Sequence, residues 1–175
     1  MSLAWRETAI GKQHDRKRFD CGVQALNDYL VRFARQNHES GGAKTFLATA
    51  AEEPNRVLGY YTVSPGAVAF SSVPPSLARG LGRYDVPVFR LGRLAVDRSA
   101  QGRGLGADLL LAAGERCLAV AAEVGGVAMA IDAKDDAAAR WYLRFGALRL
   151  LDEPLRLVLP LDTIAQALAR ATPGR

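Results

Sequence analysis

A glycine-rich segment in the middle of the chain has the composition of an anion-binding turn. It reads Gln101-Gly102-Arg103-Gly104-Leu105-Gly106 and lies between a strand-like stretch at 86–96 and a helix-like stretch at 105–124. The start of a helix offers unpaired N–H groups and the positive end of the helix dipole, and glycines let a phosphate approach the backbone. Arg103 adds positive charge. The segment therefore predicts a site for a phosphate ester, and the alternative interpretation is a turn used only for chain reversal.

The spacing of these glycines narrows the choice of ligand. A dinucleotide-binding fingerprint would read Gly-x-Gly-x-x-Gly near the start of a domain, with an acidic residue on the next strand. Here the spacing is Gly-x-Gly-x-Gly, and a long stretch of chain precedes it. The sequence Gly-Lys-Ser/Thr does not occur, which excludes a nucleotide P-loop.

Side chains that usually bind metal ions do not cluster along the sequence. Neither His14 nor His38 lies near a cysteine or near the other histidine at ligand spacing, so we expect no metal site. Cys21 and Cys117 lie far apart and form no Cys-x-x-Cys pair. We therefore interpret them as ordinary small buried residues of a protein in a reducing cytoplasm.

The first predicted elements are a helix and a hairpin. Asp20 is a candidate N-cap for a helix that runs to about His38, with an apolar face at helical spacing made of Val23, Leu26, Leu30 and Phe33. Strands are expected at 44–51 and 57–63. A break at Pro65-Gly66 separates the second strand from a possible extension at 67–73, and Pro74-Pro75 opens a short helix or loop.

The second half of the pattern alternates strands and helices. The helix at 105–124 is apolar on nearly every side, which predicts that it is covered on most faces. Asp135 or Asp136 would cap a further helix that ends before a left-handed Gly146, with a stripe made of Ala138, Trp141, Tyr142 and Phe145. The remaining strands are expected at 86–96, 127–131, 147–151 and 156–159, and a weak helix at 162–169.

Length and composition indicate one mixed α/β domain that spans residues 1–175. The chain is 49% hydrophobic, which is enough to bury a core at this size. It has no secretory signal and no apolar run long enough to cross a membrane, so we expect a cytoplasmic protein without a membrane partner. The net charge of +5 favours a polyanionic partner but does not identify one.

Two motifs resemble the acetyl-CoA signature of the GNAT acetyltransferase superfamily. Segment 91–97 followed by 101–106 is similar to the family's Gln/Arg-x-x-Gly-x-Gly/Ala motif, which follows a strand that pairs with pantetheine. Asp132-Ala133 and segment 140–147 resemble its later block, where a helix ends in Tyr-x-x-Phe-Gly. The resemblance implies the GNAT fold, with a cofactor core at roughly 86–146 and a mixed central sheet of about six to seven strands flanked by helices on both faces.

The same resemblance implies how acetyl-CoA is held. Backbone groups of Leu94, Ala95 and Val96 would pair with the pantetheine arm, and Asp132 would also lie at the cofactor. The residues whose N–H groups would hold the pyrophosphate are Gln101, Gly102, Arg103, Gly104, Leu105, Gly106 and Ala107. Two central strands would separate, so that the thioester reaches the gap between them.

Tyr142 is the candidate proton donor for the thiolate that leaves during acyl transfer. The resemblance puts it where the superfamily often carries such a tyrosine, near the sulfur. Its position on the helix stripe beside Trp141 and Phe145 also fits a core aromatic residue, and it is the motif match that favours the catalytic role.

No general base stands out in the sequence. Asp132 is a candidate whose alternative role is to orient a loop, and Glu52, Glu53 and Asp97 have the surroundings of solvated or turn residues. An α-amine has a pKa of about 7.7–8.0 and is partly neutral at physiological pH, whereas a lysine side chain near 10.4 needs far more help. This difference favours an α-amine as the acceptor.

The front of the chain resembles the GNAT toxins of bacterial toxin–antitoxin pairs. Segments 19–22, 26–30 and 57–64 are similar to their opening helix and hairpin strand, and 140–146 is close to their last block. The resemblance implies a toxin that acetylates the α-amine of aminoacyl-tRNA and so blocks translation. It also implies a homodimer and an antitoxin of the ribbon–helix–helix type.

Several arginines are candidates for tRNA phosphate contacts. Arg90 and Arg93 are favoured because their strand leads toward the predicted active site. The other candidates are Arg32, Arg35, Arg79 and Arg83. For each of them, the alternative is a solvated surface charge.

Two other functions stay open at the level of sequence. A GNAT enzyme that acetylates a small-molecule amine or a protein N-terminus would share every motif of the cofactor half. A non-catalytic module that senses acetyl-CoA or binds nucleic acid would have a degenerate site, and the intact turn and Tyr142 argue against that.

Overall fold

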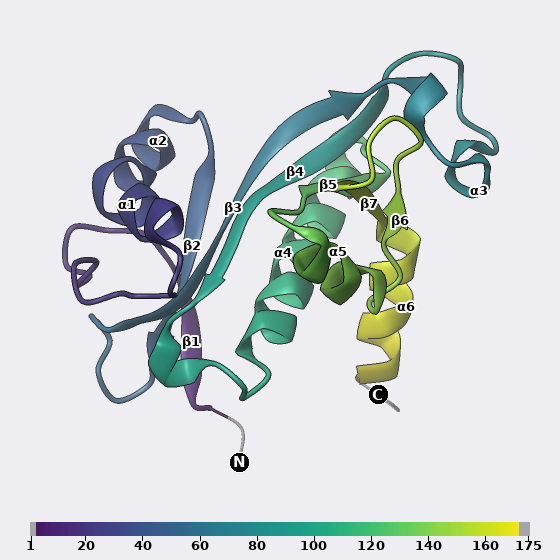
Figure 1. Cartoon of the computed structure of the whole chain (residues 1–175). Coiled ribbons are helices and arrows are strands. Elements are labelled where there is room, and N and C mark those ends of the chain that lie inside the picture. The colour runs from purple at the N-terminus through teal and green to yellow at the C-terminus, as the bar shows by residue number, and fades with distance from the viewer. Residues whose placement is uncertain (1–2, 172–175) are drawn as a thin grey trace. The chain divides into compact units, whose positions relative to one another are not determined.

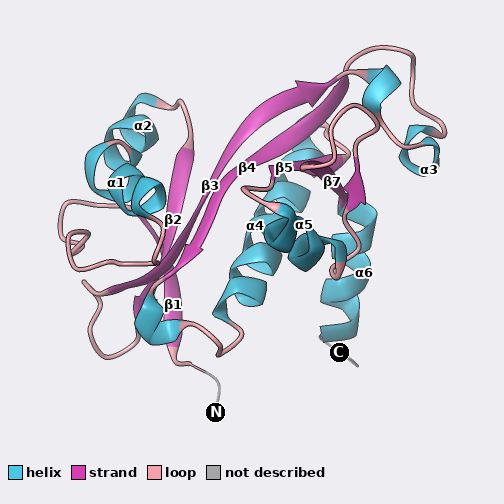
Figure 2. Cartoon of the chain, viewed as in Figure 1, coloured by secondary structure: helices cyan, strands magenta, loops and turns pink. Residues whose placement is uncertain are grey.

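The computed structural model describes residues 3–171, whose helices and strands are drawn in Figures 1 and 2. The strands are β1 (Trp5–Ala9), β2 (Lys44–Ala50), β3 (Val57–Val68), β4 (Val86–Val96), β5 (Ala128–Asp132), β6 (Leu148–Arg149) and β7 (Arg156–Pro160). The α-helices are α1 (Gln24–Arg32), α2 (Ala34–Ser40), α3 (Pro75–Ala78), α4 (Leu105–Val124), α5 (Asp136–Leu143) and α6 (Leu161–Ala171).

The described strands form one mixed sheet in the order β1-β2-β3-β4-β5-β7-β6. Strands β4 and β5 pair in parallel, from Val88 opposite Ala128 to Leu91 opposite Ile131, whereas β7 is antiparallel to both β5 and β6. The predicted mixed α/β fold with a sheet of this size is confirmed.

Within the described part of the chain, the residues divide into two compact units. The first comprises Met1–Ser64 and Gly92–Ala112, and the second comprises Pro65–Leu91 and Ala113–Arg175. Strands β3 and β4 and helix α4 contribute residues to both units. A single domain over 1–175 stays a prediction, and its ends at 1–2 and 172–175 lie outside the described residues.

In the first unit, neighbouring residues of β3 contact helices on opposite faces of the strands (Figure 1). The buried ring of Tyr60 stacks on Tyr29 of α1. The neighbouring Gly59 faces the opposite side because side chains alternate along a strand. There, Leu109 of α4 lies 2.8 Å and Leu105 lies 3.4 Å from the position that a Cβ on Gly59 would occupy. Helices α1 and α4 therefore pack on opposite faces.

Strand β1 is absent from the sequence predictions. It pairs antiparallel with β2, with Trp5 opposite Ala50 and Ala9 opposite Phe46, and it forms one edge of the sheet. Its side chains are half-buried or exposed, so the segment lacks the apolar alternation that would have revealed a strand.

Helix α1 does not begin with Asp20 as its N-cap. The N-cap residue is Val23, and no side chain caps the helix. The Asp20 carboxylate instead accepts hydrogen bonds from the Gly22 N–H and from the Asn27 side chain. The predicted capping role of Asp20 is therefore wrong, because its side chain closes a loop ahead of the helix.

The single helix expected up to His38 is in fact two helices. Phe33, with φ of −122°, separates α1 from α2, and its side chain is 53% exposed rather than part of a buried face. The Arg16 guanidinium donates hydrogen bonds to the carbonyls of Leu30 and Val31. A charged side chain from another segment thus satisfies carbonyls at the end of α1.

Strand β3 differs from the sequence prediction in its length, and helix α4 is exposed toward its C-terminal end. Strand β3 continues through Pro65-Gly66 to Val68 instead of breaking there. Helix α4 meets α6 closely, since a Cβ on Gly114 would lie 2.6 Å from Ile164, but Val120 and Val124 are 42% and 75% exposed. The apolar composition of α4 therefore does not mean that every side of it is covered.

Candidate active site

The glycine-rich turn has the backbone geometry that its composition predicts. Gly102 and Gly104 have φ of 75° and 84°, a region that residues with a Cβ rarely adopt. No atom lies within 4 Å of the position that a Cβ would occupy at either glycine, so the turn is open around them. Glycine is required there for its backbone conformation and not because of crowding.

Helix α4 starts directly after this turn and presents its N-terminus there. The Asp108 N–H donates to the Gly104 carbonyl at 3.1 Å, so the N–H groups just before Asp108 precede the helical ladder. Arg103 is exposed beside them, while the side chain of Leu105 is buried. Backbone N–H groups, a helix dipole and a guanidinium together fit the pyrophosphate of a coenzyme A thioester.

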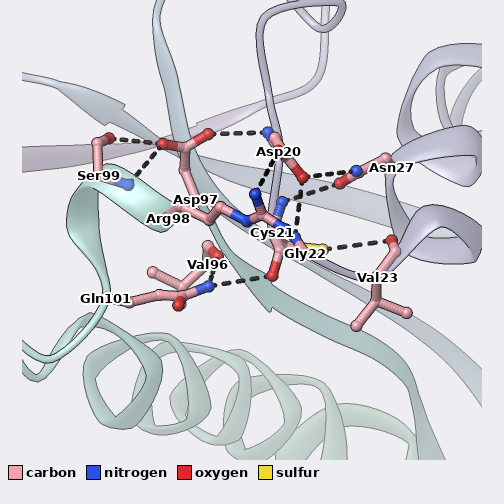
Figure 3. Close-up of polar contacts among 10 residues, drawn as sticks. All are labelled: Asp20, Cys21, Gly22, Val23, Asn27, Val96, Asp97, Arg98, Ser99 and Gln101. Carbon is pink, nitrogen blue, oxygen red and sulfur yellow. Dashed lines mark hydrogen bonds and ion pairs between the residues drawn. The ribbon is translucent and has the colours of Figure 1, made fainter.

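Gln101 takes part in this turn through its side chain. Its Nε2 donates to the carbonyls of Cys21, at 3.1 Å, and Val96, at 2.9 Å (Figure 3). The sequence predicts only a backbone contact with pyrophosphate for this residue, which stays a prediction. The side-chain contact with the segment before α1 depends on tertiary structure and is not visible in the motif.

Asp97 is a structural acid at the end of β4 and not a solvated one. Its side chain is 9% exposed and accepts hydrogen bonds from the N–H and the hydroxyl of Ser99 at 3.0 and 2.5 Å, as Figure 3 shows. It also accepts from the Asp20 N–H at 2.8 Å. The sequence leaves a solvated and a turn position open for Asp97, and the turn is what the structure shows, as an Asp-x-Ser sequence after a strand favours. The contact with Asp20 is not part of that prediction.

The predicted pantetheine strand is the last part of β4. The register with β5 ends at Leu91, and β4 continues to Val96. On its other edge, the Asp97 N–H donates to the Leu58 carbonyl of β3. Ala95 is buried in the core under α1, and Leu94 and Val96 are half-buried. The backbone beyond the β5 register is thus suited to pair with an extended ligand.

Tyr142 belongs to the second unit, on helix α5. The Asp135 side chain caps this helix by accepting from the Ala138 N–H, as predicted, and Gly146 follows with φ of 96°. The Tyr142 ring is only 9% exposed and packs edge-on against Trp141. Burial raises the pKa of Tyr142 to about 12, so the phenol keeps its proton at neutral pH.

Asp132 lies at the end of β5, in a pocket of about 460 Å³ in the second unit. The pocket is lined by Arg90, Asp132, Ala133, Glu153, Leu155 and Arg156. Asp132 faces the Arg156 guanidinium at 3.7 Å, so it is one half of an exposed ion pair. The ion pair with Arg156 is typical of a structural or binding role for Asp132 rather than of a general base. Arg90, one of the predicted tRNA contacts, lines the same pocket.

The six predicted tRNA-contact arginines are divided between the two units. The Arg93 guanidinium lies 3.5 Å from the centre of the Tyr29 ring, in the geometry of a cation–π contact, and Arg35 pairs with Glu39. Arg32 is exposed in the same unit. Arg79, Arg83 and Arg90 are exposed in the second unit.

Residues 3–171 contain no group of three or more His, Cys, Asp or Glu side chains that could hold a metal ion. None of the helices described for this chain combines the length and the apolar character that a membrane crossing requires. Cys117 is buried, and burial raises the pKa of its thiol to about 12.

Comparison with known sequences groups this chain with acetyltransferases. The family model described as acetyltransferase (GNAT) family matches residues 9–147. A curated protein named tRNA-acetylating toxin, from Mycobacterium tuberculosis, is 37% identical over 150 residues, which cover 86% of this chain and 88% of that protein.

Solved structures agree with this grouping. AtaT complexed with acetyl-methionyl-tRNAfMet matches with a TM-score of 0.87 and 26% identity, over 94% of this chain and 99% of that chain. A mutant AtaT toxin bound to the C-terminus of the antitoxin AtaR and acetyl-CoA matches with a TM-score of 0.80 and 25% identity, over 94% and 98%.

Proposed function

The chain belongs to the acetyltransferase (GNAT) family, and from this premise we propose that it transfers the acetyl group of acetyl-CoA to the α-amine of aminoacyl-tRNA. The open glycine turn at the N-terminus of α4 supports the cofactor. The 37% identical relative named tRNA-acetylating toxin supports the acceptor and a role as a toxin that blocks translation. The similarity to this relative is the observation that favours aminoacyl-tRNA as the acceptor.

Backbone groups of the first unit supply most of the cofactor contacts in this proposal, and Asp132 of the second unit adds one. N–H groups from Gln101 to Ala107 bind the pyrophosphate, and Arg103 supplies charge. The backbone of Leu94, Ala95 and Val96 pairs with the pantetheine arm, and Asp132 acts at the cofactor from the end of β5. When bound, acetyl-CoA supplies an acetyl group activated as a thioester.

Tyr142 acts as the acid in this proposal. Its phenolic oxygen holds a proton at neutral pH, as at the ordinary tyrosine pKa of about 10, and burial raises that pKa further. As the bond from nitrogen to the acetyl carbon forms and the carbon–sulfur bond breaks, Tyr142 donates this proton to the departing thiolate. The proton that the attacking nitrogen loses on becoming an amide returns to the Tyr142 phenolate, so the products are the amide and the free thiol of coenzyme A. The amine enters in its neutral form, which for an α-amine needs no dedicated base at physiological pH.

Arginines provide the contacts with tRNA phosphates. Arg90 is the favoured member, because it is exposed and lines the pocket that contains Asp132. Arg93 lies on β4, and the Tyr29 ring holds its guanidinium in place through a cation–π contact, so the guanidinium is already positioned for a phosphate. The more peripheral candidates are Arg32, Arg35, Arg79 and Arg83.

The proposed partners follow from the same family. A mutant AtaT toxin binds the C-terminus of its antitoxin AtaR, which supports an antitoxin as partner of this chain. We further propose that this antitoxin carries a ribbon–helix–helix part, that the chain is a homodimer, and that it acts in the cytoplasm. Expression of the chain should then arrest growth, and the antitoxin should relieve the arrest.

The deciding experiment incubates the purified protein with labelled acetyl-CoA and total charged tRNA, and then identifies the labelled species by mass spectrometry. We expect the label on the α-nitrogen of an amino acid still esterified to tRNA. Peptides with free N-termini, free amino acids and small amines are run in parallel.

Each rival function has its own outcome in that experiment. Label on peptides or small amines, with none on charged tRNA, would assign an ordinary GNAT enzyme. Release of no coenzyme A with any acceptor would assign a non-catalytic binding module. Faster acetylation of lysine side chains than of α-amines would contradict the α-amine acceptor.

A further inference from the structure

The segment that leads into α1 forms a closed loop held by its own side chains, and we refer to Asp20, Cys21, Gly22 and Asn27 as the clip. Asn27 accepts a hydrogen bond from the Cys21 N–H at 2.9 Å and donates one to the Asp20 carboxylate at 3.0 Å. The Gly22 N–H donates to the same carboxylate at 2.9 Å. These bonds favour the charged carboxylate and lower the pKa of Asp20.

The clip is joined to the end of β4 and to the first residue of the cofactor turn by three hydrogen bonds that run in both directions (Figure 3). The Asp20 N–H donates to the Asp97 carboxylate, and the Arg98 N–H donates to the Asp20 carbonyl, each at 2.8 Å. The Gln101 side chain donates to the Cys21 carbonyl and to the Val96 carbonyl. The clip thus contacts the end of β4 and the first residue of the turn.

The turn itself has few other restraints. Around Gly102 and Gly104 no atom lies within 4 Å of a built Cβ, and residues 101–104 are all exposed. At the far end of the turn, the buried side chain of Leu105 fixes the start of α4. At the near end, Gln101 and Asp97 supply the anchoring contacts, and both are held by the clip.

We propose that the clip is a positioning element for acetyl-CoA, which holds the near end of the Gln101–Gly106 turn so that its N–H groups converge on the pyrophosphate. This inference rests on the proposed binding of acetyl-CoA at the turn. The clip residues touch neither cofactor nor acceptor, and they act through Gln101 and Asp97. Loss of the clip therefore weakens cofactor binding and leaves the chemical step unchanged.

The test compares Asp20→Ala with Asp20→Asn. Alanine removes the acceptor for Gly22 and Asn27, whereas asparagine retains an acceptor oxygen. Acetyl-CoA affinity is measured by titration calorimetry, and kcat is measured with saturating acetyl-CoA. For Asp20→Ala we expect the Kd and the KM for acetyl-CoA to rise by about threefold to tenfold, as for the loss of one to two hydrogen bonds, with kcat within about twofold. Asp20→Asn should bind like the unchanged protein.

Two further variants keep the test decisive. Gln24→Ala removes an exposed hydrogen bond to Asp28 on α1 and serves as the matched control, with no expected change in affinity. If Asp20→Ala does not fold, Gln101→Ala tests the same link, because it removes the side-chain donor to Cys21 from an exposed position without adding a charge beside the proposed pyrophosphate site. Unchanged affinity in the clip variants, or equally weak binding by Asp20→Asn, would overturn the proposal. Failure of the unchanged protein to bind acetyl-CoA would instead refute the proposed function.

Discussion

At the scale of single residues, the hydroxyl of Tyr142 is protonated at neutral pH, as a proton donor requires. Burial raises its pKa to about 12, so the hydroxyl is protonated when the thiolate departs. Replacement by phenylalanine removes the proton and keeps the ring that packs against Trp141. We expect Tyr142→Phe to lower kcat by roughly 10²–10⁴-fold, which is the usual contribution of a positioned acid, with the acetyl-CoA Kd unchanged. Steady-state kinetics and calorimetry check both values.

The matched control for that change is Tyr84→Phe, because Tyr84 is 84% exposed and has no proposed role in catalysis. Its kcat should equal that of the unchanged protein. Turnover of Tyr142→Phe at a similar level would contradict the assignment and return Tyr142 to the role of a core aromatic residue.

Residues with local signals were predictable, and residues with long-range roles were not. The conformations of Gly102 and Gly104 follow from a motif of six residues, and the sequence predicts them as part of an anion-binding turn. Asp20, Asp97 and Gln101 act through contacts between segments nearly eighty residues apart in sequence. No spacing rule along the chain reveals such pairs, so the sequence predicts a helix cap for Asp20 and a solvated or turn position for Asp97.

At the scale of elements, the close contact of β3 with α4 sets the position of the helix that carries the turn. A Cβ added to Gly59 would lie 2.8 Å from Leu109 and 3.0 Å from the Ala95 carbonyl oxygen, and the backbone oxygen cannot move aside. We expect Gly59→Ala to lower the free energy of unfolding by about 1–3 kcal/mol through overpacking. Urea denaturation measures this change.

Gly42→Ala is the control for that experiment. Its added Cβ would meet only the Ser40 side chain, at 4.0 Å, and its φ is not positive. The stability of this variant should stay within about 0.5 kcal/mol of the original, as for most surface changes. An equal loss in both variants would show that glycine content, and not the packing of α4 on β3, determines the result.

Elements with a strong pattern of their own were predicted well. The strand at 86–96 and the helix at 105–124 match β4 and α4, because each has a long apolar signal. Edge strand β1 was missed because its half-exposed residues carry no such signal. The break at Phe33 was missed because it accompanies contacts of Arg16 with carbonyls at the end of α1, which the local helical pattern does not contain.

At the scale of the whole molecule, the net charge of +5 agrees with a polyanionic acceptor. A second property of the whole chain is how its stability responds to mild acid, and here we expect the two histidines to dominate. Desolvation lowers the pKa of His14 and of His38, and Arg16 and Lys44 respectively add to the effect. In the unfolded chain both would titrate near 6.5. The unfolded state therefore binds more protons than the folded state once the pH falls below that value.

The consequence is that the folded state loses stability between neutral pH and about pH 5. We expect the free energy of unfolding to fall progressively as the pH is lowered through this range, measured by urea denaturation at each pH. In a variant with His14→Asn and His38→Asn, the asparagine oxygens can replace the ring nitrogens that accept from the Gly11 and Thr45 N–H groups, and neither side chain titrates. Its stability should be nearly flat from about pH 7.5 to pH 5, since Asp20, whose pKa is also lowered, responds only in stronger acid. An equally steep loss in this variant would assign the acid sensitivity to other groups.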